Sequence, residues 1–135
     1  MEQENLLDLG LKGKIVVLTG AAMGIGKSLL NLFDHADCNV AAVDIERVEL
    51  FKAIGELKNP EKHMALIKDL ESSEDCESIA NEVKERYGRI DILVNNAGIL
   101  FRVPTSDVTL EMWKKVGDIN LRSQFLLCRS IGDVM

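Results

Sequence analysis

Apolar residues along the chain follow two patterns: short, nearly continuous runs and longer stretches in which they recur with helical spacing. The short runs predict strands buried on both faces, at 15–18, 40–43, 64–67 and 90–94. The helical spacing predicts helices over 24–36, 46–57 and 72–87, and a long last helix that begins at Thr109. Strands that alternate with helices in this way predict an α/β fold with a parallel sheet and right-handed crossovers.

The helical stretches also predict which side chains face the sheet. The expected faces are Ile25, Leu29, Leu32, Phe33 and Ala36 in the first helix, Leu50, Phe51, Ile54 and Leu57 in the second, and Cys76, Ile79, Ala80, Val83 and Tyr87 in the third. Ser72 and Asp75 have the spacing of a capping box, and Gly88 is placed to end that helix. In the last helix we expect Trp113 to serve packing and the run 121–128 to be buried.

Composition and charge argue against several classes of protein. The formal net charge is −6 and the pI is about 4.9, which disfavours a nucleic-acid-binding surface. No apolar run is long enough to span a membrane, and the acidic start of the chain does not resemble a signal peptide. We therefore expect a cytoplasmic protein that binds neither nucleic acid nor membrane.

Cysteine and histidine positions give little support to a metal site. Cys38, Cys76 and Cys128 are far apart and have no ligand spacing, so they are interpreted as reduced thiols in the core. His35 and His63 are also far apart. We expect no metal.

A glycine-rich corner follows the first predicted strand, with the spacing Gly20-x-x-x-Gly24-x-Gly26. The first glycine permits a sharp turn, the second leaves room for a pyrophosphate, and the third lets the helix lie close to the strand. The N–H groups and the dipole at the start of the helix favour phosphate. Met23 and Ile25 are expected to border this site; the alternative is a tight turn without a ligand.

Two carboxylates follow the next two strands. Asp44 ends the second strand, where it could accept hydrogen bonds from both ribose hydroxyls and repel a 2′-phosphate. Because the adjacent Ile45 carries no positive charge, we expect NAD to be preferred over NADP; the alternative is that Asp44 is only a helix N-cap or turn residue. Asp69 ends the third strand and could contact the adenine amino group, with Leu70 against the ring, or it could be a loop carboxylate that starts the next helix.

A second corner, Asn95-Asn96-Ala97-Gly98, follows the fourth strand. The carboxyl ends of parallel strands share one edge of a sheet, so both corners should open onto one crevice, which predicts a dinucleotide site. Phe101 and Arg102 come next and either border a substrate pocket or are ordinary loop residues. Asn120, in the last helix, could bend that helix and hold a water for a proton relay, or it could be a satisfied helix asparagine.

These segments together resemble the classical short-chain dehydrogenase/reductase family, over residues from Leu11 to the end of the chain. The resemblance rests on 19–26, Asp44, Asp69, 95–98 and Asn120, which occur in order and at similar intervals. It implies a Rossmann-like doubly wound sheet with strand order 3-2-1-4 and one NAD-binding domain over 1–135. It also implies hydride transfer between NAD and an alcohol or ketone. In the family, the segment corresponding to Asn95, Ala97 and Gly98 lines the nicotinamide side, the asparagine corresponding to Asn120 belongs to a catalytic tetrad, and the last helix contributes to a subunit interface, which implies a homo-oligomer.

The chain departs from the family in the other catalytic residues. The family uses a serine and a Tyr-x-x-x-Lys pair, but the one tyrosine here is Tyr87, and Asp91 lies four residues after it. We expect those groups, and the remaining strands, to fall after Met135, so that the sheet is incomplete on its C-terminal side. The chain alone should then associate with itself through an open strand edge and show little turnover. The alternative is a non-catalytic NAD-binding or subunit-association module.

Overall fold

The computed structural model describes residues 9–135. Its strands and α-helices, in chain order, are β1 (Ile15–Thr19), α1 (Gly24–His35), β2 (Asn39–Asp44), α2 (Arg47–Gly55), β3 (Met64–Ile67), α3 (Ser73–Tyr87), β4 (Ile92–Val94), α4 (Leu110–Gly117) and α5 (Ser123–Gly132). Two short 3-10 helices, η1 (Pro60–Lys62) and η2 (Thr105–Asp107), and one π-helix, η3 (Asp118–Arg122), complete the set within these residues.

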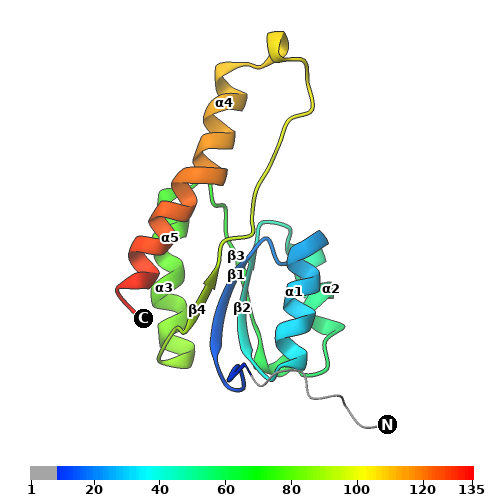
Figure 1. The fold of residues 1–135 in the computed structure, drawn as a ribbon, viewed down its shortest axis with the longest axis vertical. Helices are drawn as coiled ribbons and strands as arrows, with labels where there is room; N and C mark the ends of the chain where they lie inside the picture. The colour runs from blue at the N-terminus through cyan, green and yellow to red at the C-terminus, as the bar shows by residue number, and fades with distance from the viewer. Residues whose placement is uncertain (1–8) are drawn as a thin grey trace.

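The strands form one parallel sheet in the order β3-β2-β1-β4, which confirms the predicted α/β fold and strand order. Val17 of β1 is in register with Ala41 of β2 and with Leu93 of β4. Helices α1 and α2 cover one face of the sheet, and α3 and α5 cover the other (Figure 1). Helix α4 projects past the end of the sheet at which the strands terminate (Figure 1).

Two apolar cores, one on each face, result from the alternation of side chains along the strands. In β1, Ile15 and Val17 belong to the core under α3 and α5, whereas Val16 and Leu18 belong to the core under α1 and α2. Because both faces are covered, the strand is apolar at consecutive positions and all five of its residues are buried.

The predicted faces of the first two helices were partly wrong. Ile25 and Leu32 of α1 are exposed, and the buried residues of this helix are Gly26, Leu30 and Asp34. Phe51 of α2 is also half exposed, beneath the guanidinium of Arg47 at 5.3 Å from the ring centre. In α1 the close approach of Gly26 sets the inward face, so the apolar spacing alone misplaced it by about one residue.

Helix α3 has the predicted apolar stripe, and Gly88 ends it with a positive φ of 80°. Ser72 caps it by accepting a hydrogen bond from the Asp75 N–H at 3.2 Å. The Asp75 carboxylate does not complete a capping box, because it accepts instead from the Asp69 N–H at 2.8 Å. The cap therefore also anchors the loop that follows β3.

The long last helix is broken by the π-helix η3 between α4 and α5. The extra residue in a π turn changes the phase of the helix, so the face that is buried in α5 is not continuous with one face of α4. Leu126 and Leu127 are buried as expected, but Leu121, Phe125 and Trp113 are exposed, contrary to expectation.

Asp118 secures the π-helix through two ion pairs. Lys114 Nζ lies 2.6 Å and Arg122 Nη1 lies 3.2 Å from its carboxylate oxygens. The hydrogen bond from Lys114 lowers the pKa of Asp118 below its ordinary value, against a smaller opposing effect of burial. The ion pairs thus favour the charged form of Asp118 at the point where the helix changes its winding.

The three cysteines are free thiols, and Cys38 and Cys76 are buried as predicted. Burial raises the pKa of both of these thiols. Cys128 is exposed, so its assignment to the core was wrong. Within residues 9–135 no group of three His, Cys, Asp or Glu side chains is placed to hold a metal ion. None of the helices in this range is long and apolar enough to cross a membrane.

Candidate functional site

The carboxyl ends of the strands border a cleft of about 610 Å³. Its walls come from the glycine corner, the ends of β2 and β3, the second corner and α4 with η3. The lining residues are Gly20, Met23, Ile25, Val43, Asp44, Ile45, Glu46, Lys68, Asp69, Leu70, Glu71, Asn96, Ala97, Gly98, Ile99, Lys115 and Ile119. Such a volume and position are typical of ligand sites in open parallel sheets.

The two corners are fastened to each other by the buried Thr19 and by Asn96. The Thr19 hydroxyl accepts hydrogen bonds from the N–H groups of Asn96 at 3.1 Å and Ala97 at 3.0 Å. The Asn96 side-chain amide donates to the carbonyls of Thr19 at 3.1 Å and Gly20 at 3.2 Å. These bonds hold the ends of β1 and β4 at a fixed separation and so shape one side of the cleft.

Glycine suits each of the three positions of the first corner for a different structural reason. Gly20 has a φ of +66°, and a Cβ there would lie 2.9 Å from Asn96 Nδ2 and 3.0 Å from Ala97 Cα. A Cβ on Gly26 would lie 1.8 Å from the Gly20 carbonyl oxygen, so the helix could not approach the strand. Gly24 has a φ of +57° and no described atom within 4 Å of its Cβ position.

The start of α1 is suited to an anion. Met23, at the N-cap, makes no side-chain capping hydrogen bond to the described residues, and the first turn contains no acidic side chain. Among the described residues these N–H groups therefore have no side-chain cap and no acidic side chain within the turn, and the Asp44 carboxylate is bonded to Ala22 N–H, two residues before the helix. A Cβ on Gly24 would meet open space, so this side of the helix start is not crowded, and an uncapped helix start favours a phosphate.

Asp44 lies at the end of β2, and both of its carboxylate oxygens accept backbone hydrogen bonds. Oδ2 accepts from Ala22 N–H at 2.9 Å, and Oδ1 accepts from Glu46 N–H at 3.0 Å. The side chain thus has the turn role that was considered as an alternative, and it also fastens the glycine corner to β2. Each oxygen has a further lone pair with which it could accept a ribose hydroxyl.

The segment after β3 contributes another wall of the cleft. Asp69 closes a turn by accepting from Glu71 N–H at 2.9 Å, and Leu70 is buried beside it. Arg122 of η3 donates to the Glu71 carbonyl, and Lys115 of α4 lies 3.9 Å from the Glu71 carboxylate. This wall is therefore tied to the helices that stand above the sheet.

Asn120 makes a two-point contact with the chain after the second corner. Its Oδ1 accepts from Ile99 N–H, and its Nδ2 donates to the Ile99 carbonyl, both at 2.8 Å. A Cβ on Gly98 would lie 3.4 Å from Asn120 Oδ1. The amide fixes the path of the main chain as it leaves the cleft.

Most of the candidate residues lie together in the cleft, but some do not. Gly20, Met23, Ile25, Asp44, Ile45, Asp69, Leu70, Ala97 and Gly98 line it, whereas Gly24 and Gly26 lie in the first turn of α1 and are not among its lining residues. Asn95 is not among the lining residues: its Nδ2 lies 3.5 Å from Cys128 Sγ, and its Oδ1 is buried without a hydrogen-bond partner among the described residues.

Thr19 and Asn96, which were not among the predicted site residues, join the two corners. The sequence did contain a sign of this contact: a hydroxyl side chain ends one buried strand, and an amide side chain follows the end of another. Tyr87 lies away from the cleft, because its hydroxyl donates to the Lys62 carbonyl at 2.7 Å, just before β3 begins. Phe101 and Arg102 are exposed and do not line the cleft.

Comparison with known proteins identifies clear relatives. The family model described as short chain dehydrogenase matches residues 14–135. The NAD-dependent glycerol dehydrogenase of Listeria innocua is 36% identical over 128 residues, which cover 95% of this chain and 50% of that protein. The chain thus spans about half the length of the curated relatives it matches.

Solved structures show the same arrangement of the chain. A short-chain dehydrogenase/reductase described as glucose/ribitol dehydrogenase, from Brucella melitensis, has a TM-score of 0.87 and 32% identity, over 91% of this chain and 52% of that one. A 3-ketoacyl-(acyl-carrier-protein) reductase from the same organism, complexed with NADH, has a TM-score of 0.86 and 26% identity, over 92% of this chain and 51% of that one.

Proposed function

Because this chain belongs to the short-chain dehydrogenase family, we propose that it forms the NAD-binding part of an oxidoreductase that acts on an alcohol or ketone. The observation that carries the proposal is the convergence of the glycine corner, the Asp44 carboxylate and the second corner on one cleft. When bound, a nicotinamide dinucleotide would supply or accept the hydride. The chain's own residues bind and orient it there.

We assign the pyrophosphate to the start of α1 and the adenine half to the ends of β2 and β3. The support for this is that the first turn of α1 has no side-chain cap among the described residues and no acidic side chain, and that the Cβ position of Gly24 is open. Asp44 would accept the ribose hydroxyls, and Asp69 with Leu70 would border the adenine. Ala97 and Gly98 would lie toward the nicotinamide.

We propose that the cleft prefers NAD to NADP. Asp44 would repel a 2′-phosphate, and Glu46 lines the same wall. The two lysines of the cleft are both close to carboxylates: Lys68 Nζ lies 2.6 Å from Glu82, and Lys115 Nζ lies 3.9 Å from Glu71. Neither offers an unopposed positive charge to an additional phosphate.

Asn120 is proposed to act by positioning. Since its amide oxygen and nitrogen each bond Ile99, it holds the main chain at the edge of the cleft. Any proton relay would pass a water near this π-helix, and we assign no acid or base step to Asn120 itself. The buried thiols of Cys38 and Cys76 agree with a reducing compartment, and we propose the cytoplasm.

Titration of the chain with NADH, followed by nucleotide fluorescence, tests the proposal. We expect saturable binding with a Kd on the order of 10–100 μM, within the range common for enzyme ligands. ADP-ribose should compete, because it contains every group assigned above except the nicotinamide. A folded chain that shows no saturable NADH binding would contradict the proposal.

We further propose that α4, η3 and α5 contact a second copy of the chain. The exposed residues Leu110, Trp113, Leu121 and Phe125, with relative exposures of 86%, 74%, 73% and 60%, place apolar side chains along these helices. Exposed apolar surface of this kind marks contact sites. This surface also supports the alternative that the chain serves subunit association without catalysis.

The Leu121→Glu variant tests this interface. A buried, unpaired carboxylate in an apolar contact is costly, so we expect the wild-type chain to sediment as an oligomer and the variant as a monomer. Leu32→Glu is the matched control, because Leu32 is an exposed leucine of α1 on the other face of the sheet. The interface proposal fails if the wild-type chain is monomeric, or if both variants sediment as the wild type does.

A further inference from the structure

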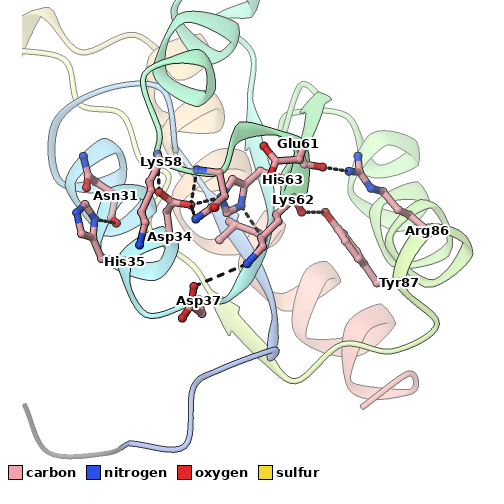
Figure 2. Close-up of polar contacts among 12 residues, drawn as sticks. Asn31, Asp34, His35, Asp37, Lys58, Glu61, Lys62, His63, Arg86 and Tyr87 are labelled. Atoms are coloured by element: carbon pink, nitrogen blue, oxygen red, sulfur yellow. Dashed lines mark hydrogen bonds and ion pairs between the residues drawn. The ribbon is translucent and has the colours of Figure 1, made fainter.

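A buried polar pair lies at the end of the sheet opposite the cleft. Asp34 of α1 and His63, which directly precedes β3, have side-chain exposures of 1% and 0%. Their oxygen Oδ1 and nitrogen Nε2 lie 2.8 Å apart (Figure 2). Neither residue borders the nucleotide cleft.

The hydrogen bonds of the pair define its protonation. Val40 N–H of β2 points at His63 Nδ1 over 3.1 Å, and a backbone N–H can only donate. Nδ1 is therefore the acceptor, and the ring proton is on Nε2, from which it is donated to Asp34. The first residue pair between β2 and β3 is Ala41 with Met64, and Val40 lies one residue before it. The His63 ring therefore binds the backbone N–H of β2 that comes just before the pairing of the two strands begins.

The Asp34 carboxylate accepts hydrogen bonds from three residues of the connection between α2 and β3. It accepts from Lys58 N–H at 2.8 Å, from Asn59 N–H and Nδ2 at 3.3 Å, and from His63. Burial tends to raise the pKa of Asp34, but the hydrogen bonds from His63, Lys58 and Asn59 outweigh it and lower the pKa below the ordinary value. The stabilisation from this carboxylate is thus complete at neutral pH and is lost as the pH falls through that lowered pKa.

The same connection is also held from other elements (Figure 2). Tyr87 Oη donates to the Lys62 carbonyl at 2.7 Å, and Arg86 donates to the Glu61 carbonyl at 3.1 Å, both from α3. Lys62 Nζ lies 3.7 Å from Asp37, beyond the end of α1. The Asp34–His63 pair is the buried member of this set, and the other contacts lie nearer the surface.

We infer that Asp34 and His63 are positioning residues for the nucleotide cleft, acting through β3. Within the described residues β3 pairs only with β2 and is four residues long. His63 attaches its amino end to β2 through Val40, and Lys68 N–H attaches its carboxyl end to the Asp44 carbonyl at 3.2 Å. Asp69 and Leu70 follow directly, so the pair sets where they enter the cleft. This inference rests on the proposed nucleotide site.

Variants of the two histidines test it. In His63→Ala the Val40 N–H is buried without a partner, and we expect NAD⁺ and ADP-ribose to bind about tenfold more weakly, within the range that an unsatisfied donor produces. In His63→Asn the amide oxygen lies near the place of Nδ1, and we expect recovery to within about threefold of wild type. His35→Ala, at an exposed histidine of α1, should bind as wild type does. Calorimetry well below the melting temperature of each variant gives these affinities.

Two further measurements separate the positioning role from general stability and from the nucleotide proposal. Amide exchange of Val40 and of β3 should accelerate about tenfold in His63→Ala and return toward wild type in His63→Asn. Nitrogen NMR of the wild-type ring should find the proton on Nε2 at neutral pH. A folded His63→Ala chain with wild-type nucleotide affinity and exchange would overturn the inference, and so would a proton on Nδ1. If the wild-type chain binds no NAD⁺, the nucleotide proposal fails. The amide exchange rates and the position of the ring proton still test whether the Asp34–His63 pair holds β3 against β2.

Discussion

Gly26→Ala is expected to abolish nucleotide binding and to destabilise the fold. The new methyl group would lie 1.8 Å from the Gly20 carbonyl oxygen and 2.7 Å from Asn96 Nδ2, so α1 must move away from both corners. Overpacking of a rigid core costs about 1–3 kcal/mol, and here the obstacle is backbone, so we expect about 3 kcal/mol less free energy of unfolding. NADH affinity should fall by a factor on the order of 100, because α1 moves away from the groups assigned to the nucleotide, and a loss of about 3 kcal/mol in binding free energy corresponds to about two factors of ten.

Gly55→Ala is the matched control for this substitution. Gly55 is the last residue of α2, and no described atom lies within 4 Å of its Cβ position. Alanine there should leave the stability unchanged or raise it by up to about 1 kcal/mol, because alanine has the higher helix propensity. Chemical denaturation and NADH titration of both variants measure the contrast. A Gly26→Ala chain that folds and binds as Gly55→Ala does would show that the corner is not closely packed.

Asp44→Ala is expected to remove the discrimination between NADH and NADPH. Charged hydrogen bonds to ribose hydroxyls are worth about 1.5–3 kcal/mol each, so NADH affinity should fall by roughly 10- to 100-fold while NADPH affinity is retained or rises. Part of the NADH loss will come from Ala22, because its N–H loses the Asp44 carboxylate as acceptor. Fluorescence titration with both nucleotides measures the ratio.

Two controls separate charge from structure at this position. Asp44→Asn keeps one acceptor oxygen for the backbone but removes the charge, so it should gain NADPH affinity with a smaller loss for NADH. Asp107→Asn removes the same charge at an exposed position in η2 and should leave the preference unchanged. If the wild-type chain binds both nucleotides equally, or if Asp44→Asn preserves a strong NADH preference, the carboxylate does not select the cofactor.

The sheet order and the approximate place of each strand could be predicted because buried parallel strands are apolar at consecutive positions and alternate with helices. The inward faces of the helices were less predictable. Asp34 is polar yet buried, which only its partners from the α2–β3 connection explain. Leu121 and Phe125 are apolar yet exposed, because the π-helix shifts the phase of the stripe. Neither a distant polar partner nor an inserted helical residue is visible in local spacing.

The candidate site was predictable where one residue type serves a single geometric need. Gly20 and Gly26 are of this kind, because a side chain at either would meet the backbone. The different roles of Asn95 and Asn96 were not predictable, because the two side chains are identical and both follow the end of β4. The structure turns Asn96 toward β1 and Asn95 toward Cys128.

The hydrogen bonds of Thr19 and Asn96 that link the two corners affect how fast and how tightly a ligand binds. These hydrogen bonds are formed by the protein alone, so the loss of conformational entropy at the two corners is incurred during folding and not at the encounter with the ligand. The recess is preorganised on this side. Ligand association at the two corners should proceed without a slow isomerisation step. Replacing Thr19 should lower the association rate constant although it removes no contact assigned to the ligand, because the two corners would no longer be held together before the ligand binds.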